Sequence, residues 1–442
     1  MGFKIDSQTY NDLNIFGGYE NTSSIFKLFK GTKTLGGREL MEFMMRNPLN
    51  SISELNKRTD AIRFFLQKKL NLEIDHNQFD LILHYLNYEK GELRSNWVDS
   101  FIPWLGNQIK SNPNYYVVQV GIKFLLRLLK YAGEVVSVLA EDDVPKALCD
   151  IKDSIQNILE TNRISYAYSL SSKEKLSFKQ LGKIDSIIRR ESRLVILELL
   201  HLFYQLDVFE TLADVSDKNK FCLPTYDERD LALIKLKGLY HPSISAPVKN
   251  DLQIEEQNLM FLSGSNMAGK SSFLKALGLA GYLAHLGFPV PAASMQTSVF
   301  NGLVTTINLP DNIENGLSHY YSEVKRVKMI ANMLIEQQKL FIILDELFKG
   351  TNSKDAYEAS LLVINGFAEI PNSVFIISSH ITTLASELKA KNISFNYLEH
   401  LMIDQEATFT YHLKNGVASD GIGMYFIEKE NIQELLNRAK NN

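Results

Sequence analysis

Hydrophobic residues recur at every third or fourth position along the first half of the chain. The spacing is regular in Leu40–Leu49, Ile122–Ala140 and Leu194–Val215. Residues spaced in this way share one face of an α-helix, so the pattern predicts a helical domain as far as about Val215. No sequence repeat of fixed period accompanies the pattern, which argues against a helical solenoid.

From about Phe221 the pattern changes, because short apolar runs now alternate with helical segments. The runs are LMFLSG at 259–264, LFIILDE at 340–346, SVFIISSH at 373–380 and TFTYHL at 408–413. Such alternation is typical of an α/β domain with a largely parallel sheet. The two patterns together predict an all-helical domain over residues 1–219 followed by an α/β domain over residues 220–442.

Composition and charge narrow the range of function classes. Hydrophobic residues make up 45% of the 442 residues and charged residues 22%, which excludes a disordered, collagen-like or disulfide-rich chain. The net charge of −4 gives no global basic field for nucleic acid, although a local basic face is compatible with it. Cys149 and Cys222 lie far apart, so we expect a reducing compartment and no cysteine metal site.

The sequence also argues against a membrane protein. The N-terminal residues lack the basic-then-apolar order of a signal peptide. Four charged residues interrupt the apolar stretch Tyr115–Ala140, and prolines interrupt the uncharged stretch Ala276–Pro310. We therefore expect a cytoplasmic protein without a membrane partner.

The strongest chemical signal is a phosphate-binding loop. Residues 264–271, GSNMAGKS, fit G-x-x-x-x-G-K-[ST] between a predicted strand and the apolar helix Ser271–Leu286. Backbone N–H groups at the start of such a helix bind phosphates, Lys270 would neutralise their charge, and the Ser271 hydroxyl would bind Mg²⁺. A glycine-rich turn with a chance Lys-Ser pair is the alternative, and both flanks argue against it. The residues expected to contact ATP are Gly264, Ser265, Asn266, Met267, Ala268, Gly269, Lys270, Ser271 and Ser272.

Two further strands end in polar residues. The run 341–346 ends at Asp345 and Glu346, and the run 373–379 is followed by His380. Because ligands bind at the carboxyl edge of a parallel sheet, we expect all three side chains at the phosphate site. Asp345 would hold Mg²⁺ and Glu346 would orient the attacking water, with His380 and Lys270 completing the catalytic group. Alone, an acidic strand end or a single histidine is more often structural.

At this point the motifs resemble the ATPase domain of the MutS family of DNA mismatch-repair proteins, within the ABC-type ATPases. GSNMAGKS resembles G-P-N-M-G-G-K-S, with Ser265 and Ala268 as departures. Residues 311–323 are similar to the signature D-x-x-x-x-G-x-S-T-F-x-x-E, with His319 and Tyr320 as departures. Residues 345–355 resemble D-E-x-G-R-G-T-S-T-x-D, with departures at Phe348, Lys349, Asn352 and Ser353. Three shorter matches are His241-Pro242, Ser379-His380 and the segment 413–423.

The resemblance implies how the site works. In ABC-type ATPases two nucleotide domains face each other, and the signature of one completes the ATP site of the other. Ser318 would therefore contact the γ-phosphate held by the partner's loop, and Asn352 and Ser353 would line the dimer seam. A helix cap is the ordinary interpretation of Ser318. The resemblance thus implies a homodimer with ATP and Mg²⁺ as cofactors.

The resemblance covers residues 220–442 firmly and the helical half weakly, through Asp12–Ile15 and Thr34–Leu40. The intervening helices resemble the family's lever arms. The family's mismatch reader carries an F-x-E motif, which does not occur in residues 1–250. We therefore expect a truncated member that lacks the mismatch-reading and connector domains, most or all of the clamp, and a C-terminal nuclease domain.

One basic stretch, residues 173–193, bears on DNA binding. A solvated helix face is its ordinary interpretation, and a phosphate-contacting arm is the alternative. Its candidate DNA contacts are Lys173, Lys175, Lys179, Lys183, Arg189, Arg190 and Arg193.

The sequence thus predicts a MutS-like ATPase whose ATP cycle moves helical arms and acts on DNA in repair or recombination. Transporter-type and chromosome-maintenance ABC ATPases carry L-S-G-G-Q, which is absent from this sequence. A second alternative is a DNA-independent ATPase or scaffold that recruits protein partners through its helical half. With the reader expected to be missing, mismatch recognition is not predicted.

Overall fold

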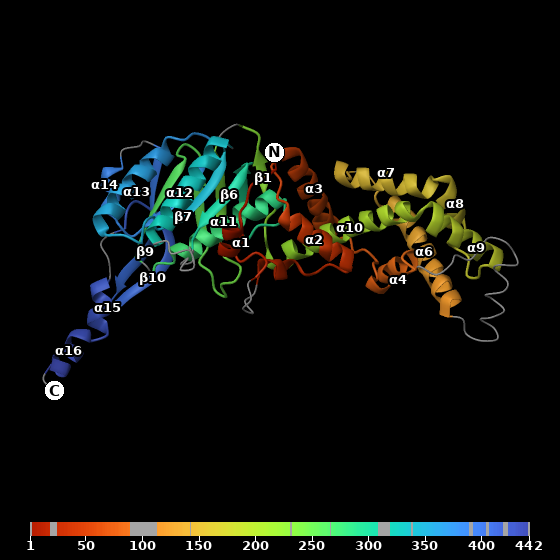
Figure 1. The fold of residues 1–442 in the computed structure, drawn as a ribbon, viewed down its shortest axis with the longest axis horizontal. Coiled ribbons are helices and arrows are strands. Elements are labelled where there is room, and N and C mark those ends of the chain that lie inside the picture. The colour runs from red at the N-terminus through yellow and green to blue at the C-terminus, as the bar shows by residue number, and fades with distance from the viewer. Residues whose placement is uncertain are drawn as a thin grey trace. The chain divides into compact units, whose positions relative to one another are not determined.

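A computed structural model describes the chain over most of its length (Figure 1). The described residues are 2–17, 24–88, 113–141, 143–229, 232–265, 267–307, 319–336, 339–388, 392–403, 406–418 and 423–440. They form two compact units. Unit 1 comprises Met1–Leu28, Asn47–Asn56 and Val215–Asn442, and unit 2 comprises Phe29–Arg46 and Lys57–Asp214.

All regular elements in the described residues of unit 2 are helices. They are α2 (Leu35–Arg46), α3 (Ile52–Lys68), α4 (His76–Leu86), α6 (Pro113–Val138), α7 (Lys146–Glu160), α8 (Asn162–Ser169), α9 (Phe178–Ser186), the π-helical η2 (Ile187–Glu191) and α10 (Arg193–Asn219), and the start of α3 and the end of α10 extend into unit 1. The predicted spacing explains their packing. In α7, for example, the buried residues are Leu148, Ile151, Ile155, Ile158 and Leu159, which fall on one face.

A buried ionic cluster joins three of these helices. The fully buried carboxylate of Asp185 in α9 accepts hydrogen bonds from the Tyr85 hydroxyl of α4 (2.8 Å) and from the Arg189 guanidinium of η2 (2.6 and 2.8 Å). Burial, and next the Asp185 charge, raise the pKa of Tyr85 well above its ordinary value. Since each charged group has a partner, the cluster links α4, α9 and η2 without leaving an unpaired buried charge.

Unit 1 contains the α/β domain, and its main sheet has six strands in the order β10-β9-β4-β8-β7-β6. The strands are β4 (Leu259–Ser263), β6 (Gly302–Thr306), β7 (Leu340–Asp345), β8 (Val374–Ser379), β9 (Ile393–Ile403) and β10 (Glu406–Asn415). The first five run parallel, and β10 pairs antiparallel with β9 at one edge. The largely parallel sheet expected from the sequence is therefore present.

A second sheet of four strands was not predicted. Its order is β1-β5-β2-β3, with β1 (Thr225–Asp227), β2 (Ile234–Leu239), β3 (Asn250–Ile254) and β5 (Ser294–Ser298). Only β1 and β5 pair in parallel. These strands are short, and two of them are only half buried, so their hydrophobic pattern is weak.

Helices cover both faces of the main sheet (Figure 1). All six residues of β7 are buried, and alternate side chains face opposite layers. Ile342 and Leu344 belong to the core cluster with α12 (His319–Glu336) and α13 (Ser353–Ala368). Phe341 lies on the other face, against α11 (Lys270–Leu286), where a Cβ at Gly281 would come within 2.6 Å of its ring.

The N-terminal segment packs onto the β6 edge. Lys4 forms an isolated parallel bridge with Gly302, and α1 (Ser7–Asp12) follows it. The Asp12 carboxylate accepts hydrogen bonds from the Thr305 hydroxyl (2.8 Å) and the Ile307 backbone N–H (2.9 Å). These contacts place Met1–Leu28 in unit 1, whereas the sequence had suggested a helical domain over residues 1–219.

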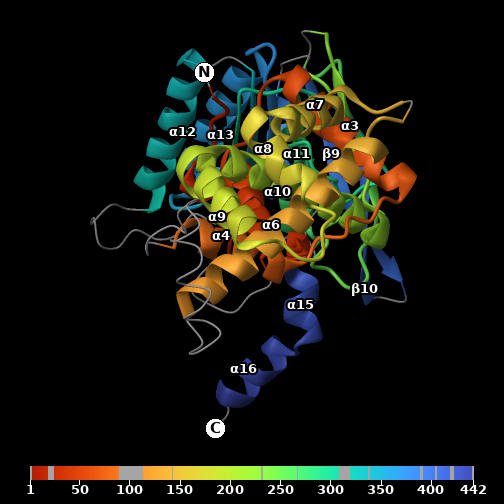
Figure 2. The same cartoon turned by 90° about the vertical axis from the view of Figure 1, so that its right-hand side faces the viewer.

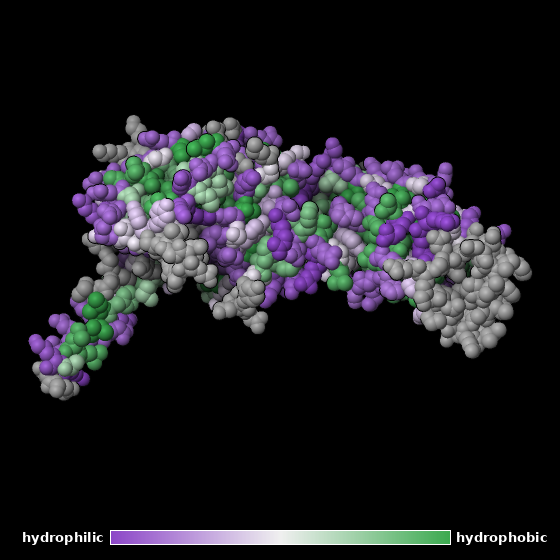
Figure 3. Space-filling model, in the orientation of Figure 1, coloured by the Kyte–Doolittle hydropathy of each residue, from purple (hydrophilic) through white to green (hydrophobic). Residues whose placement is uncertain are grey.

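The remaining helices of unit 1 are short. They are α14 (Leu384–Glu387), α15 (Gly423–Lys429) and α16 (Ile432–Lys440), preceded in the chain by the 3₁₀ helix η1 (Ile25–Phe29). No residue of α16 is buried, and its apolar side chains Ile432, Leu435 and Leu436 form part of the green surface near the C-terminus in Figure 3. Within the described ranges, no helix is both long and apolar enough to span a bilayer.

The buried His285 should make unit 1 sensitive to acid. Its Nε2 accepts from the Phe300 N–H (2.8 Å) and burial lowers its pKa to about 4. Because the unfolded chain titrates near 6.5, the neutral folded form loses stability as pH falls below that value. We expect the free energy of unfolding to drop by about 2 kcal/mol between pH 7 and pH 5 from this group, measured by urea unfolding.

His285→Leu should be less stable at pH 7, because the Phe300 N–H loses its acceptor, and should lack this part of the pH dependence. Phe300→Leu is the matched control, since its ring lies 5.8 Å from the imidazole. That variant opens a cavity but retains the histidine, so it should keep the wild-type difference between the two pH values. An unchanged pH dependence in His285→Leu would contradict the assignment.

Candidate nucleotide-binding site

Three neighbouring strands of the main sheet end at one edge. In the register, Ser263 of β4 lies opposite Ser379 of β8, and Ser378 lies opposite Asp345 of β7. The chain continues from these ends into the glycine-rich loop, into Glu346 and into His380. The topology thus brings together side chains that are up to 116 residues apart in the sequence (380 minus 264).

The glycine-rich loop leads from a fully buried strand into α11. Gly264 and Gly269 adopt positive φ angles of 148° and 91°, which glycine tolerates best. Ala268 is fully buried and does not have a positive φ, so its Cβ causes no backbone strain at a position where the resemblance expects glycine. Met267 is exposed, and Ser271 and Ser272 are exposed in the first turn of α11. Asn266 lies outside the described residues.

Lys270 is buried beneath this loop. Its Nζ donates to the carbonyl oxygens of Gly264 (2.6 Å) and Ser265 (3.2 Å), and it lies 3.5 Å from a carboxylate oxygen of Glu346. Burial lowers the pKa of the Lys270 amine, while the carboxylates of Glu346 and Asp345 oppose that shift. The Ser265 hydroxyl is buried without a hydrogen-bond partner. An unsatisfied hydroxyl beside a buried cation is suited to an anionic ligand.

Ser271 and Asp345 converge on one another. The Ser271 hydroxyl donates to Asp345 Oδ2 at 2.5 Å, and the Ser378 hydroxyl donates to Asp345 Oδ1. A hydroxyl and a carboxylate are hard oxygen ligands of the kind that Mg²⁺ prefers. These two residues therefore fit the metal-binding role expected from the sequence.

Glu346 is surrounded by three cationic or protonatable groups. Its carboxylate lies 3.1 Å from Lys349 Nζ and 3.6 Å from His380 Nδ1, besides its contact with Lys270. The neighbouring His380, followed by Lys349 and Lys270, lowers the pKa of Glu346 to about 2 against the effect of burial. The side chain of Glu346 is only 14% exposed, whereas that of His380 is 55% exposed. Glu346 is therefore an ionised acceptor held at the rim of the loop.

The loop after β7 is attached to the start of α12. Glu323, which is buried, accepts hydrogen bonds from the backbone N–H groups of Lys349 (3.1 Å) and Gly350 (3.3 Å). The Tyr320 ring lies 5.7 Å from the ring of Phe348. Glu323 was not named as a site residue, although it is the final acid of the signature-like segment. Ser318, the predicted contact to a partner's nucleotide, lies outside the described residues.

The structure gives Asn352 and Ser353 a local role. Asn352 is the N-cap of α13, and its side chain accepts from the N–H groups of Lys354 (3.1 Å) and Asp355 (3.0 Å). Ser353 is the first residue of that helix, and both residues are exposed. Capping explains why asparagine occurs here, and a role at a dimer seam stays a prediction.

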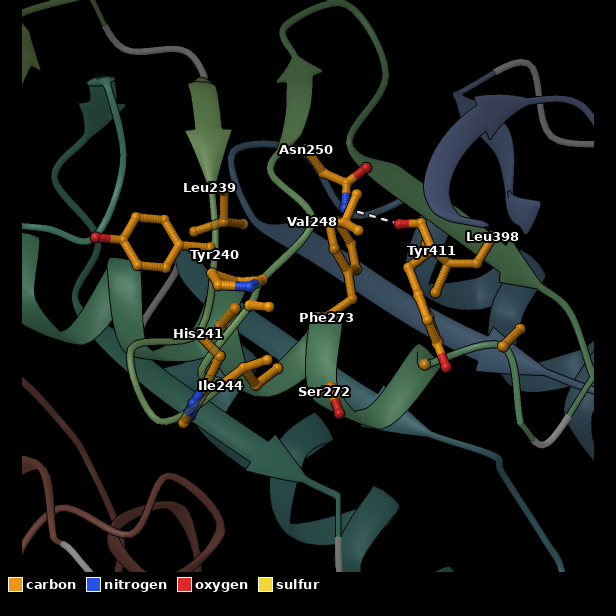
Figure 4. Close-up of a pocket in the computed structure, with 15 residues that line it drawn as sticks. Leu239, Tyr240, His241, Ile244, Val248, Asn250, Ser272, Phe273, Leu398 and Tyr411 are labelled. Carbon is orange, nitrogen blue, oxygen red and sulfur yellow. Dashed lines mark hydrogen bonds between the residues drawn. The ribbon is translucent and has the colours of Figure 1, made fainter. Parts of the chain in front are cut away.

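A pocket of about 330 Å³ adjoins the glycine-rich loop (Figure 4). It is mainly apolar, and its lining residues include Leu239, His241, Val248, Phe273, Leu398 and Tyr411. Burial, and next the Lys275 charge, lower the pKa of His241. His241 of the His-Pro match therefore lines a pocket beside the phosphate loop. The sequence alone did not indicate this position, because His241 precedes Gly264 by 23 residues (264 minus 241).

Tyr411 was missed by the sequence analysis. It has a positive φ of 59° at a register shift in β10, and a Cβ added at Gly269 would lie 3.0 Å from its ring. Asn250 holds this segment by donating to the Tyr411 carbonyl (3.0 Å) and accepting from the Leu413 N–H (2.7 Å), as Figure 4 shows in part. Only the TFTYHL strand signal pointed to this region.

The candidate DNA contacts separate into two groups. Four lysines, Lys173, Lys175, Lys179 and Lys183, are exposed, as are Arg190 and Arg193. Arg189 has a side chain that is only 6% exposed and is paired with Asp185, so its predicted availability to DNA is corrected to a role in the core of unit 2. Arg193 also donates to the Leu86 carbonyl (3.3 Å) and to Asn87 (2.6 Å), at the C-terminal end of α4.

Comparison with known proteins supports the resemblance in the second half of the chain. A family model described as MutS domain V matches residues 260–442. The DNA mismatch repair protein MSH3 of Candida glabrata is 29% identical over 246 residues, which are 53% of this chain and 24% of that protein. The DNA mismatch repair protein MutS of Anaplasma phagocytophilum is 31% identical over 228 residues, 50% of this chain and 27% of that protein.

A third relative extends the similarity further along the chain. The DNA mismatch repair protein MutS of Petrotoga mobilis is 26% identical over 297 residues, 64% of this chain and 35% of that protein. The chain spans about a quarter to a third of the length of these curated relatives. Residues 260–442 are thus similar to MutS domain V, and the chain is similar to DNA mismatch repair proteins over about half its length or somewhat more.

Proposed function

We propose that this chain is a MutS-like ATPase that binds ATP and Mg²⁺ at the edge formed by β4, β8 and β7, and that it acts on DNA in repair or recombination. The observation that carries the proposal is the meeting of Lys270, Ser271, Asp345, Glu346 and His380 at the ends of three adjacent strands. Chance does not readily produce a phosphate loop, a metal-type oxygen pair and an oriented carboxylate at one sheet edge. The match to MutS domain V supports the same conclusion.

The phosphates of ATP would bind at the start of α11. Free N–H groups and the helix dipole make this helix terminus favourable for negative charge. Lys270 already lies beneath the loop, where its carbonyl contacts are replaceable by phosphate oxygens. An arriving phosphate would favour the charged amine, whose pKa is lowered by burial in the protein alone.

Ser271 and Asp345 would hold Mg²⁺, which neutralises charge on the β- and γ-phosphates when it is bound. Ser378 orients Asp345 from the middle strand, so the carboxylate is fixed before any ligand arrives. Such fixed oxygen ligands lower the cost of organising the site.

Glu346 would orient the attacking water. With its pKa near 2, this carboxylate is a weak base, so we assign it mainly to accepting a hydrogen bond from the water and aligning it. His380 is exposed beside it and would contact the water or the γ-phosphate. Burial of Glu346 between Lys349, Lys270 and His380 limits its movement.

The base of the nucleotide would occupy the apolar pocket beside Gly269. Tyr411 and Phe273 offer ring surfaces there, and Leu239, Val248 and Leu398 provide aliphatic walls. Both polar atoms of the Asn250 amide form hydrogen bonds with the backbone of β10. The base would therefore be held mainly by shape complementarity and by stacking on aromatic rings.

We also propose that two copies of the chain complete each ATP site. Ser318 would contact the nucleotide of the partner, and the exposed Asn352 and Ser353 would lie near the seam. ATP would then favour the closed homodimer and hydrolysis would release it. The helices of unit 2 would convert closure into movement of arms on DNA, as the resemblance to MutS proteins suggests.

Glu346→Gln tests the catalytic assignment. We expect the ATP turnover rate to fall at least about 100-fold, because the amide aligns the water poorly. ATP affinity should be equal or higher, since a negative charge beside the phosphates is removed. Turnover would be measured by phosphate release and affinity by a fluorescent ATP analogue. Glu358→Gln, an exposed change in α13, is the control and should behave as wild type; equal turnover in both variants would refute the assignment.

Tyr411→Ala tests the base pocket. Loss of the ring should raise the KM for ATP about 3- to 10-fold with little change in kcat, because stacking holds substrate and transition state equally. Tyr411→Phe keeps the ring and is the matched control, with a KM close to wild type. If Tyr411→Ala keeps the wild-type KM, the base does not bind against Tyr411 and this assignment is wrong.

A further inference from the structure

The helical unit contains a groove that the proposed nucleotide site does not use. Its volume is about 840 Å³, and it lies between α6 and the segment that leads into α9. These helices lie side by side in Figures 1 and 2. The lining residues are Gln119, Lys123, Leu126, Arg127, Lys130, Ser171, Ser172, Lys173, Glu174, Lys175, Leu176, Phe178 and Leu181.

One wall of the groove is a line of cations on α6. Lys123, Arg127 and Lys130 are exposed and follow the spacing i, i+4, i+7, which places them along one face. At 1.5 Å per residue the line is about 10 Å long, so its three cations can contact about two or three successive phosphates of one strand. Within the line, Lys130 also contacts Glu134 at 3.7 Å.

The other wall supplies Lys173 and Lys175, both exposed. Glu174 is the single acidic residue among the lining residues, so the groove carries five cations against one anion. The sequence grouped Lys173 and Lys175 with the basic residues up to Arg193. The structure groups them instead with cations about 50 residues earlier, on α6 (173 minus 123).

We propose that this groove binds the sugar-phosphate backbone of one DNA strand. The cations are spread along two walls rather than converging on a point, which suits a chain of phosphates better than a single small anion. Neighbouring cations of the line on α6 are about 5–6 Å apart, which is compatible with the regular phosphate spacing of a nucleic-acid strand.

The proposal for the groove rests on the DNA-binding part of the proposed function and is independent of ATP hydrolysis. The two can fail separately. ATP turnover without DNA tests the nucleotide site, while DNA affinity tests the groove. A chain that binds DNA through the groove but does not hydrolyse ATP would overturn only the ATPase assignment.

The test compares the full-length wild type with Lys123→Gln/Arg127→Gln/Lys130→Gln. Fluorescence anisotropy would follow binding to a labelled 30-nucleotide single strand and to the same length of duplex, at 50 and 200 mM KCl. Five phosphate contacts predict that wild-type affinity for the single strand falls about 100-fold between the two salt concentrations. The triple variant keeps two contacts and should lose only about 7-fold over the same range.

The matched control is Lys57→Gln/Lys69→Gln/Lys146→Gln, which removes the same charge from exposed lysines outside the groove lining. It should keep the wild-type salt dependence, and all variants should hydrolyse ATP at the wild-type rate without DNA. If the control variant loses as much DNA affinity and salt dependence as the groove variant, the groove is not the DNA-binding site. Failure of the wild type to bind DNA at 50 mM KCl would also contradict the proposal. So would a competition experiment in which poly-glutamate of equal charge displaces the labelled DNA as well as unlabelled DNA does.

Discussion

The buried ammonium group of Lys270 is the interaction on which the site depends. An isolated cation in a protein interior is costly, and burial here lowers the pKa of the amine. The group is stabilised because the loop turns two carbonyl oxygens toward it, Glu346 lies 3.5 Å away and the Asp345 charge is also favourable. Those contacts in turn require the positive φ angles at Gly264 and Gly269. Loop conformation, the position of the acid and the charge of the lysine are therefore coupled.

The contact between Lys270 and Glu346 also requires that strands β4, β8 and β7 run parallel. Lys270 follows β4 while Glu346 follows β7, and β8 lies between those strands. Only parallel strands bring all three carboxyl ends to one edge. Ser378 of the middle strand donates to Asp345 and accepts from the Glu346 N–H at 3.2 Å, so β8 fixes both acids. A middle strand thus serves as a spacer and as a hydrogen-bonding support.

The local features of the site could be predicted from the sequence, and the long-range ones could not. The loop spacing, the acidic strand end and the histidine after a strand are encoded within a few residues each, and the structure brings them together. The basic neighbours of Arg189 favoured an exposed side chain. Asp185, four residues earlier, and the backbone carbonyl of Tyr88, just beyond the end of α4, hold it in the core instead. Tyr411 reaches Gly269 only through the register shift in β10 and its anchoring by Asn250. Such placements depend on strand pairing, which no local pattern specifies.

The departures from the MutS-like motif also become coherent in three dimensions. Phe348 occupies a position where the motif has glycine, and its φ of 60° is one that glycine adopts freely. For a bulky residue that conformation costs on the order of 1–3 kcal/mol. The Phe348 side chain is nearly fully buried and contacts Tyr320, itself a departure from the motif. Burial of a phenylalanine side chain contributes about 1.5–3 kcal/mol, enough to offset the strain.

Glu323, one turn after Tyr320 in α12, binds the loop after β7 through two hydrogen bonds. The contact between Phe348 and Tyr320 adds apolar packing between the same loop and the same helix, which a glycine at position 348 would not provide. The start of α12, which contains the last residues of the signature-like segment, is thereby held against the loop that carries Glu346.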